Sequence, residues 1–155
     1  MEIDVTNFSE ASKILTSRYG SQNVQNIDNK NLSWKTHGTD GLIEGYAIFS
    51  NNVVVEMSLT FDGNANFTTQ NLVEILGEPT WVFVAGQPNN PCWGFDLLYS
   101  TQGFYVSLIT NKEQKGIAPS QQVFMVRFLQ SDITENWNVN DGSLVKWDGY
   151  KDYCP

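Results

Sequence analysis

Apolar residues recur at helical spacing in two short segments of the chain. In the first, Asn7 and Glu10 have the spacing of a capping box, and Gly20 follows the last apolar position. The second begins with two threonines and ends in Gly-Glu-Pro. A polar cap before an apolar stripe and a glycine after it are typical of an α-helix. We therefore predict helices from Asn7 to Tyr19 and from Thr68 to Leu76.

Most of the remaining apolar residues follow the pattern of β-strands. From Val53 to Phe61, apolar and polar residues alternate with a period of two, which predicts a strand with its odd-numbered side chains in the core. A shift of one residue would bury Glu56 and expose the apolar set, so the pattern specifies the register. The same reasoning predicts strands at Leu42 to Phe49, Phe95 to Tyr99 and Phe104 to Ile109, with weaker candidates at Val24 to Ile27, Leu32 to Thr36, Trp81 to Ala85 and Val123 to Leu129.

These elements predict an α+β fold in which an antiparallel sheet packs on the two short helices. Both halves of the chain contain, in order, a helix, a glycine stop, a tryptophan and a hairpin with a polar turn. We interpret this order as a degenerate tandem repeat of a helix-plus-meander unit, at about 6–61 and about 67–110, followed by a C-terminal strand and tail at 120–155. Chance is the alternative, because these elements are common. Neither unit is large enough to be stable alone, so we expect one domain over residues 1–155.

The predicted core follows from the strand pattern and from the repeat. Trp34 and Trp93 occupy corresponding places in the two halves, so both are assigned to the core. The other predicted core residues are Val55, Met57, Leu59, Leu97, Tyr99, Val106 and Leu108.

One junction in the second half resembles a known family. The run from Leu72 to Thr80 ends a helix in Leu-Gly-Glu-Pro and leads into strands; the glycine suits a helix cap, and the proline prevents the helix from continuing. This junction resembles that of small envelope lipoproteins of the SmpA/OmlA type, and two tandem helix-plus-meander units resemble the β-lactamase-inhibitor-protein fold. The order of residues from Cys92 to Gly103 is also similar to bacterial extracytoplasmic domains. The resemblance covers about Phe67 to Ile109. It implies a non-catalytic envelope or secreted module and assigns no catalytic residue.

The charge balance argues against nucleic acid and anionic membrane as partners. The 155 residues include nine Lys and Arg against seventeen Asp and Glu, a formal charge of −8, which is the wrong sign for a surface that collects phosphates. No apolar run is long enough to span a membrane, and the start of the chain lacks the features of a signal peptide. A removed leader would not be visible. We expect an extracytoplasmic or secreted location, with a lipid anchor on a removed N-terminal segment as one form of it.

Candidate catalytic residues are few. His37, the one histidine, lies in a polar stretch that predicts a loop, and it is the only general base for a Ser or Cys nucleophile. No Gly-x-Ser-x-Gly elbow, Walker loop or dinucleotide fingerprint is present. Glu56 and Asp96 would form an acid and base pair only if they faced each other across a sheet; a solvated surface is the default for both. We expect no enzyme activity, and in particular no hydrolysis that depends on His37.

A short polar segment, Asp62 to Asn66, has alternating oxygen ligands like the front of a calcium loop. The pattern then fails, because Phe67 stands where such a loop needs glycine and Val73 where it needs glutamate. A turn built on Asn, Asp and Gly explains the segment more simply. Neither a metal nor a cofactor is therefore expected.

The two cysteines, Cys92 and Cys154, are predicted to form a disulfide that ties the C-terminal tail to the body. An even pair is typical of proteins from an oxidising compartment. The tail also has too little apolar periodicity to be held by packing alone. The alternative, a nucleophilic Cys92, requires a partner base.

Aromatic residues make up 13% of the chain, and four of them lie in the polar tail: Trp137, Trp147, Tyr150 and Tyr153. They either form a binding surface or pin the tail to the body. Two functions fit the sequence. The first is a non-catalytic module that binds another protein, or has a structural envelope role, through an exposed sheet face. The second is binding of a small ligand or carbohydrate through tail or pocket aromatics. A flat apolar sheet face would favour the first, and a deep aromatic pocket the second.

Overall fold

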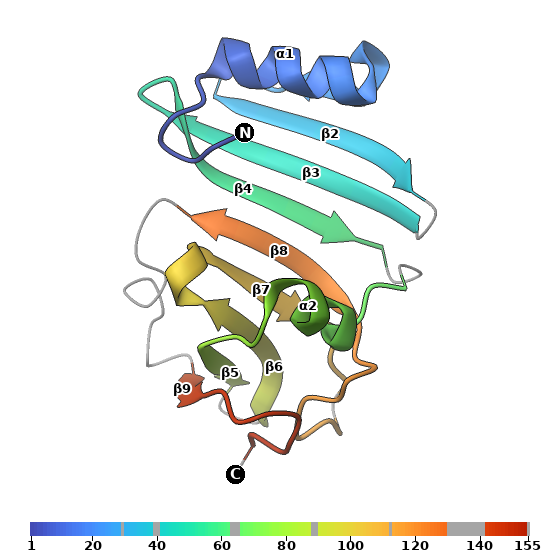
Figure 1. The fold of residues 1–155 in the computed structure, drawn as a ribbon, viewed down its shortest axis with the longest axis vertical. Coiled ribbons are helices and arrows are strands. Elements are labelled where there is room, and N and C mark those ends of the chain that lie inside the picture. Colours follow the sequence, from blue (N-terminus) through green and yellow to red (C-terminus); the bar gives the residue numbers. More distant parts are fainter. Residues whose placement is uncertain are drawn as a thin grey trace. The chain divides into compact units, whose positions relative to one another are not determined.

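The computed structural model describes residues 1–28, 30–38, 41–62, 66–87, 90–111, 113–129 and 142–154. Within these ranges the chain forms two α-helices and nine β-strands with antiparallel pairing (Figure 1). The fold is α+β, as predicted. In the described residues, no helix is both long and apolar enough to span a membrane.

The chain divides into two compact units, which are described separately. Unit 1 comprises Met1–Ala65 and Arg127–Gln130, and unit 2 comprises Asn66–Val126 and Ser131–Pro155. One strand, β8 (Val123–Leu129), contributes residues to both units. The single domain predicted over residues 1–155 means that the two units unfold together, and this stays a prediction.

Unit 1 is a helix followed by an antiparallel meander. Its helix is α1 (Phe8–Tyr19), and its strands β1 (Val24–Asn26), β2 (Asn31–Gly38), β3 (Gly41–Ser50) and β4 (Val53–Phe61) are neighbours in chain order. The predicted cap is present: the side-chain oxygen of Asn7 accepts a hydrogen bond from the backbone N–H of Glu10 at 3.0 Å. Asn51 and Asn52 both have positive φ, which is the conformation of a tight hairpin turn between β3 and β4.

A register shift in the β3–β4 hairpin corrects the predicted core of unit 1. Ile48 pairs with Glu56 whereas Phe49 pairs with Val54, so Val55 is an extra residue in β4. Val54 is fully buried and Val55 is not, so the assignment of Val55 to the core was wrong. Beyond the shift the agreement is partial, because Ser58, predicted to lie near water, is buried, and Met57 and Leu59, predicted to be core, are only partly buried. Met57 and Leu59 pack, half-buried, against a core of Ala11, Leu15, Leu32, Trp34, Ala47, Phe49 and Val54.

Unit 2 begins with α2 (Thr69–Leu76), which is capped by Thr68 and Asn71 through reciprocal hydrogen bonds. Its strands β5 (Trp81–Gln87), β6 (Asn90–Tyr99), β7 (Phe104–Leu108) and β9 (Gly142–Lys146) lie in the order β7-β6-β5-β9. A short 3₁₀ turn and Gly103, with φ of +73°, connect β6 to β7. The predicted core residues Leu97, Tyr99, Val106 and Leu108 are all buried.

Trp93 is not a core residue, contrary to the prediction. Its side chain is 58% exposed. Ala85 of β5 pairs with Gly94, but Gln87 already pairs with Asn90, so residues 91 to 93 lie opposite a single residue of β5. This irregularity removes Trp93 from the regular alternation. Trp34, assigned by the same repeat argument, is buried.

The close packing of Trp34 on Gly45 generates a stability prediction. The two residues pair across β2 and β3, and a Cβ at position 45 would overlap the indole ring. We expect Gly45→Ala to lower the free energy of unfolding of the protein by about 2 kcal/mol, because the ring must move within a filled core. Urea unfolding measures the change.

Gly94→Ala is the matched control, since it lies in a strand of unit 2 where, among the described residues, an added Cβ would meet only the Cβ of Ala85, at 3.9 Å. Its unfolding free energy should stay within about 0.5 kcal/mol of the wild-type value. Equal losses of unfolding free energy in the two variants would contradict the prediction, because they would show that the Trp34 ring does not restrict side-chain size at position 45.

Candidate functional site

His37 lies near the end of strand β2, where it pairs with Leu42, and not in a loop as predicted. Its side chain is exposed. The hairpin extends further than its apolar residues indicate, because Gly38 and Gly41 still form a strand pair. His37 is therefore a surface residue of a regular strand.

The other polar candidates, Glu56 and Asp96, belong to different units. Glu56 forms an ion pair with Arg127 inside unit 1, with 3.2 Å between Oε1 and Nε. Asp96 belongs to unit 2. In the described part of the chain, no group of three or more His, Cys, Asp or Glu residues has an arrangement that would hold a metal. Residues 63–65 of the Asp62 to Asn66 segment lie outside the described residues.

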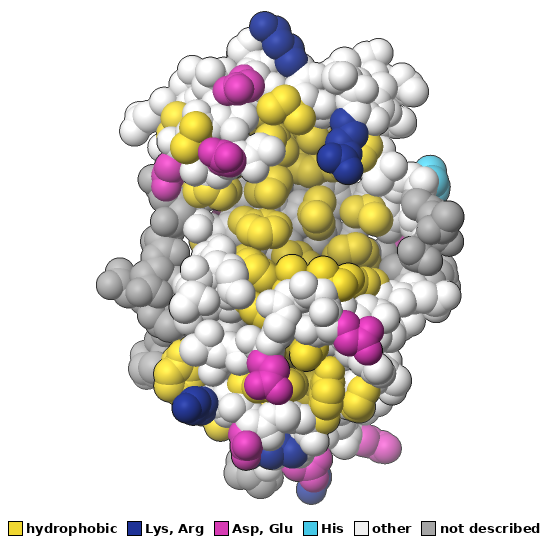
Figure 2. All heavy atoms as spheres, in the orientation of Figure 1, with side chains coloured by type: hydrophobic (Ala, Val, Ile, Leu, Met, Phe, Trp, Pro, Cys, Tyr) yellow, Lys and Arg dark blue, Asp and Glu magenta, His cyan; other side chains and the backbone are white. Residues whose placement is uncertain are grey.

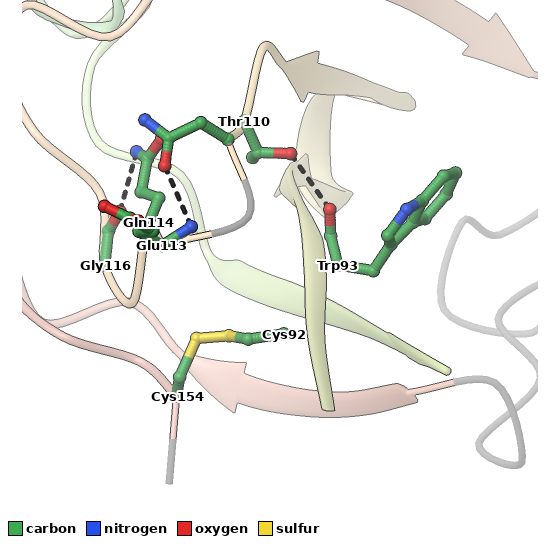
Figure 3. Close-up of a disulfide and its surroundings, with 8 residues drawn as sticks. Cys92, Trp93, Thr110, Glu113, Gln114, Gly116 and Cys154 are labelled. Carbon is green, nitrogen blue, oxygen red and sulfur yellow. Dashed lines mark hydrogen bonds between the residues drawn. A yellow bond between two sulfur atoms is a disulfide. The ribbon is translucent and has the colours of Figure 1, made fainter. Parts of the chain in front are cut away.

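Cys92 and Cys154 form the predicted disulfide, with their Cα atoms 5.8 Å apart (Figure 3). Cys92 lies in β6 and is buried. Its sulfur is bonded, so it is not a thiol nucleophile while the disulfide is intact. The bond closes a loop with a sequence separation of 62 residues and holds the end of the chain to unit 2.

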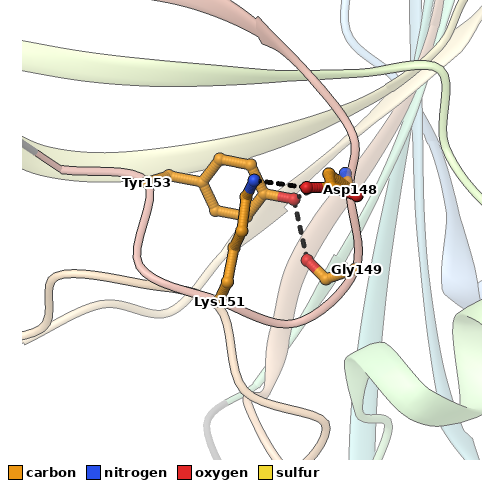
Figure 4. Close-up of polar contacts among 4 residues, drawn as sticks. All are labelled: Asp148, Gly149, Lys151 and Tyr153. Atoms are coloured by element: carbon orange, nitrogen blue, oxygen red, sulfur yellow. Dashed lines mark hydrogen bonds and ion pairs between the residues drawn. The ribbon is translucent and has the colours of Figure 1, made fainter.

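Backbone hydrogen bonds also hold the tail. The N–H groups of Tyr153 and Cys154 both donate to the carbonyl oxygen of Lys115 at 3.0 Å. The N–H of Trp147 donates to the carbonyl oxygen of Thr80 at 3.2 Å. The Tyr153 hydroxyl donates to the carbonyl oxygen of Gly149 at 2.7 Å and accepts from the N–H of Asp148 (Figure 4). The tail thus has a defined path over unit 2.

Two of the four tail aromatics are used for packing. Trp147 and Tyr153 are both buried and stack at 6.0 Å between ring centroids. Tyr150 contacts the edge of Trp147 and keeps 38% of its surface exposed. Burial raises the pKa of both tyrosines above the usual value. Trp137 lies outside the described residues. The tail therefore offers Tyr150 as its exposed aromatic among those described.

An aromatic groove lies elsewhere on unit 2. It has a volume of about 510 Å³, and its lining includes Ala85, Trp93, Gly94, Asp96, Ser107 and Phe124. Phe124, in β8, is 45% exposed. The hydroxyl of Thr110 donates to the carbonyl oxygen of Trp93 at 2.9 Å and fixes the backbone there, while the indole points away from the disulfide (Figure 3). We call this site the Trp93 groove.

Sequence reasoning missed the Trp93 groove for two reasons. It assigned Trp93 to the core. It gave Phe124 no role, because the residues from Val123 onward are apolar in succession and their pattern does not show which of them is exposed. The glycine beside Trp93 was the one available signal, since glycine within a strand often marks a close approach or a bulge.

A second candidate surface lies on unit 1, and we call it the unit 1 apolar face. Helix α1 packs mainly against β1 and β2, while Met57 and Leu59 of β4 lie half-buried on the same side as the core. Hydrophobic side chains gather beside α1, over β3 and β4 (Figure 2). The opposite face of β4 carries Glu56, Ser58 and Thr60, of which Ser58 is buried, so its accessible polar side chains are those of Glu56 and Thr60.

Comparison of the chain with protein-family models, with curated proteins and with solved structures gives no match. The two candidate surfaces are therefore interpreted from their own geometry.

The disulfide generates a second prediction. Replacing both cysteines, C92S/C154S, should lower the free energy of unfolding of the protein by about 4 kcal/mol, because the open unfolded chain regains the conformational entropy that the closed loop loses. Urea unfolding of the oxidised protein and the double variant measures the difference. Reduced wild-type protein should unfold like the variant. An unfolding midpoint unaffected by reductant would contradict the prediction.

Proposed function

We propose that this protein is a non-catalytic binding module that contacts a protein partner through the unit 1 apolar face. The observation that carries the proposal is the partly buried position of Met57 and Leu59, which lie beside the core on the helix-covered side of the sheet and keep part of their surface accessible. Apolar side chains that remain accessible beside a core are a feature of interaction surfaces. Strand pairing on β4 holds their backbone in place, so little conformational entropy is lost on binding.

Charge supports a protein partner over nucleic acid or anionic lipid. The net charge is −8, which repels phosphates. The same charge favours a partner with basic residues around an apolar centre. The accessible parts of Met57 and Leu59 would supply that centre.

The absence of catalysis is part of the proposal. It is supported by the state of the two residues best suited to nucleophilic chemistry. The sulfur of Cys92 is in a disulfide, and His37 lies exposed on a strand.

An extracytoplasmic or secreted location fits this function, and the Cys92–Cys154 disulfide supports it, because such bonds persist in oxidising compartments. We further propose that the two units are a degenerate tandem repeat related to SmpA/OmlA-type and β-lactamase-inhibitor-protein-like domains. Each unit starts with a side-chain-capped helix, ends that helix at a glycine with positive φ, and continues into antiparallel strands. A lipid anchor on a removed segment belongs to the same proposal.

Leu59→Gln tests the contact face. This change keeps the side-chain size but places a polar amide on the unit 1 apolar face. Affinity capture from envelope extracts identifies the partner, and calorimetry with the purified partner measures Kd. Loss of one buried leucine contact should raise Kd about tenfold or more.

Thr60→Gln is the control, because Thr60 is the adjacent residue on the opposite face of β4 and is also partly exposed. It should bind the partner like the wild type, and circular dichroism should show both variants folded. A Kd that responds to Thr60→Gln and not to Leu59→Gln would place the contact on the other face and overturn the proposal.

A further inference from the structure

We infer that the Trp93 groove is a binding site for a small organic cation of the alkylammonium class. The inference is independent of the proposed protein contact, because the groove lies in unit 2 and shares no residue with the unit 1 apolar face.

The first argument is the aromatic lining. Trp93 and Phe124 come from different strands, β6 and β8, and both keep about half of their surface accessible. Both line the same groove. The face of an aromatic ring attracts a cation, and tryptophan does so most strongly. Alkyl groups on an ammonium ion also gain from apolar contact with such rings. Two accessible rings in one groove therefore favour a cation that carries alkyl groups.

The second argument is charge. Asp96 lines the groove, and the described lining residues include no lysine or arginine. The net charge of −8 adds to this field and raises the concentration of cations near the surface. A neutral or anionic ligand would gain nothing from either contribution.

The third argument is shape. Gly94 and Ala85 pair across β6 and β5, and their small side chains leave room at the base of the groove. Asp96 and Ser107 pair across β6 and β7, so strand hydrogen bonds hold the polar groups in place. A volume of about 510 Å³ lies within the usual range for small-molecule sites. The groove suits a compact ligand whose charge lies near the rings.

Choline is a suitable probe, because it carries a trimethylated ammonium group and has a neutral analogue of the same shape in which carbon replaces the nitrogen. We expect saturable choline binding by calorimetry or by NMR shifts of groove residues. The neutral analogue should bind at least about tenfold more weakly, since it lacks the attraction to the rings and to Asp96.

Variants locate the site. Trp93→Ala should raise the Kd for choline about tenfold, and Asp96→Asn should raise it severalfold by removing the charge. Phe124→Ala provides a second aromatic variant that should also weaken binding. Tyr150→Ala is the matched control, because Tyr150 is another exposed aromatic of unit 2 that does not line the groove; its Kd should equal the wild-type value.

Three results would overturn the inference. The first is equal binding of choline and its neutral analogue, which would mean that charge is not recognised. The second is binding of glucose without binding of choline, which would make the groove a sugar site. The third is unchanged choline binding by folded Trp93→Ala and Phe124→Ala variants, which would place the cation elsewhere.

Discussion

An α-helix is about 10 Å across, whereas neighbouring strands lie about 4.8 Å apart, so one helix covers about two strands of a sheet. This constraint governs both units. In unit 1, α1 packs mainly against β1 and β2, and the chain supplies no second helix there among the described residues. The helix side of β4 consequently leaves Met57 and Leu59 only partly buried. The unit 1 apolar face remains accessible because one helix is too narrow to cover all the strands of unit 1.

Unit 2 meets the same constraint differently. Its helix α2 has only eight residues, and the C-terminal tail adds apolar cover through Trp147 and Tyr153. Tyr99 shows how completely this region is closed. It is fully buried, stacks on Phe104 and donates a hydrogen bond to the carbonyl oxygen of Gly77 at the end of α2. Burial, with a smaller contribution from Tyr150, raises the pKa of its hydroxyl. The tail can serve as cover because the disulfide and the hydrogen bonds to Lys115 hold it.

Local signals in the sequence predicted most of the elements. The caps at Asn7 and Thr68 and the paired asparagines of the β3–β4 turn depend on residues close in the chain, and all are present. The disulfide was predictable because there are only two cysteines. Strand β9 was missed, since its five residues gain their place by pairing with β5, a partner distant in sequence. The prediction of which side chains point into the core also failed wherever an extra residue enters a strand, because the alternating pattern assumes an unbroken register.

Those irregularities coincide with both candidate surfaces. The extra residue at Val55 places Val54 in the core while Met57 and Leu59 stay on the helix side. The mismatch at residues 91 to 93 releases Trp93 from the alternation, beside the small residues that form the base of its groove. Bulges change the direction of side chains without ending a strand, and they are enriched near functional sites for that reason. In unit 2 the pattern-based prediction therefore fails at Trp93, which lines the groove, whereas in unit 1 it fails at Val55, which is close in sequence to the unit 1 apolar face but does not belong to it.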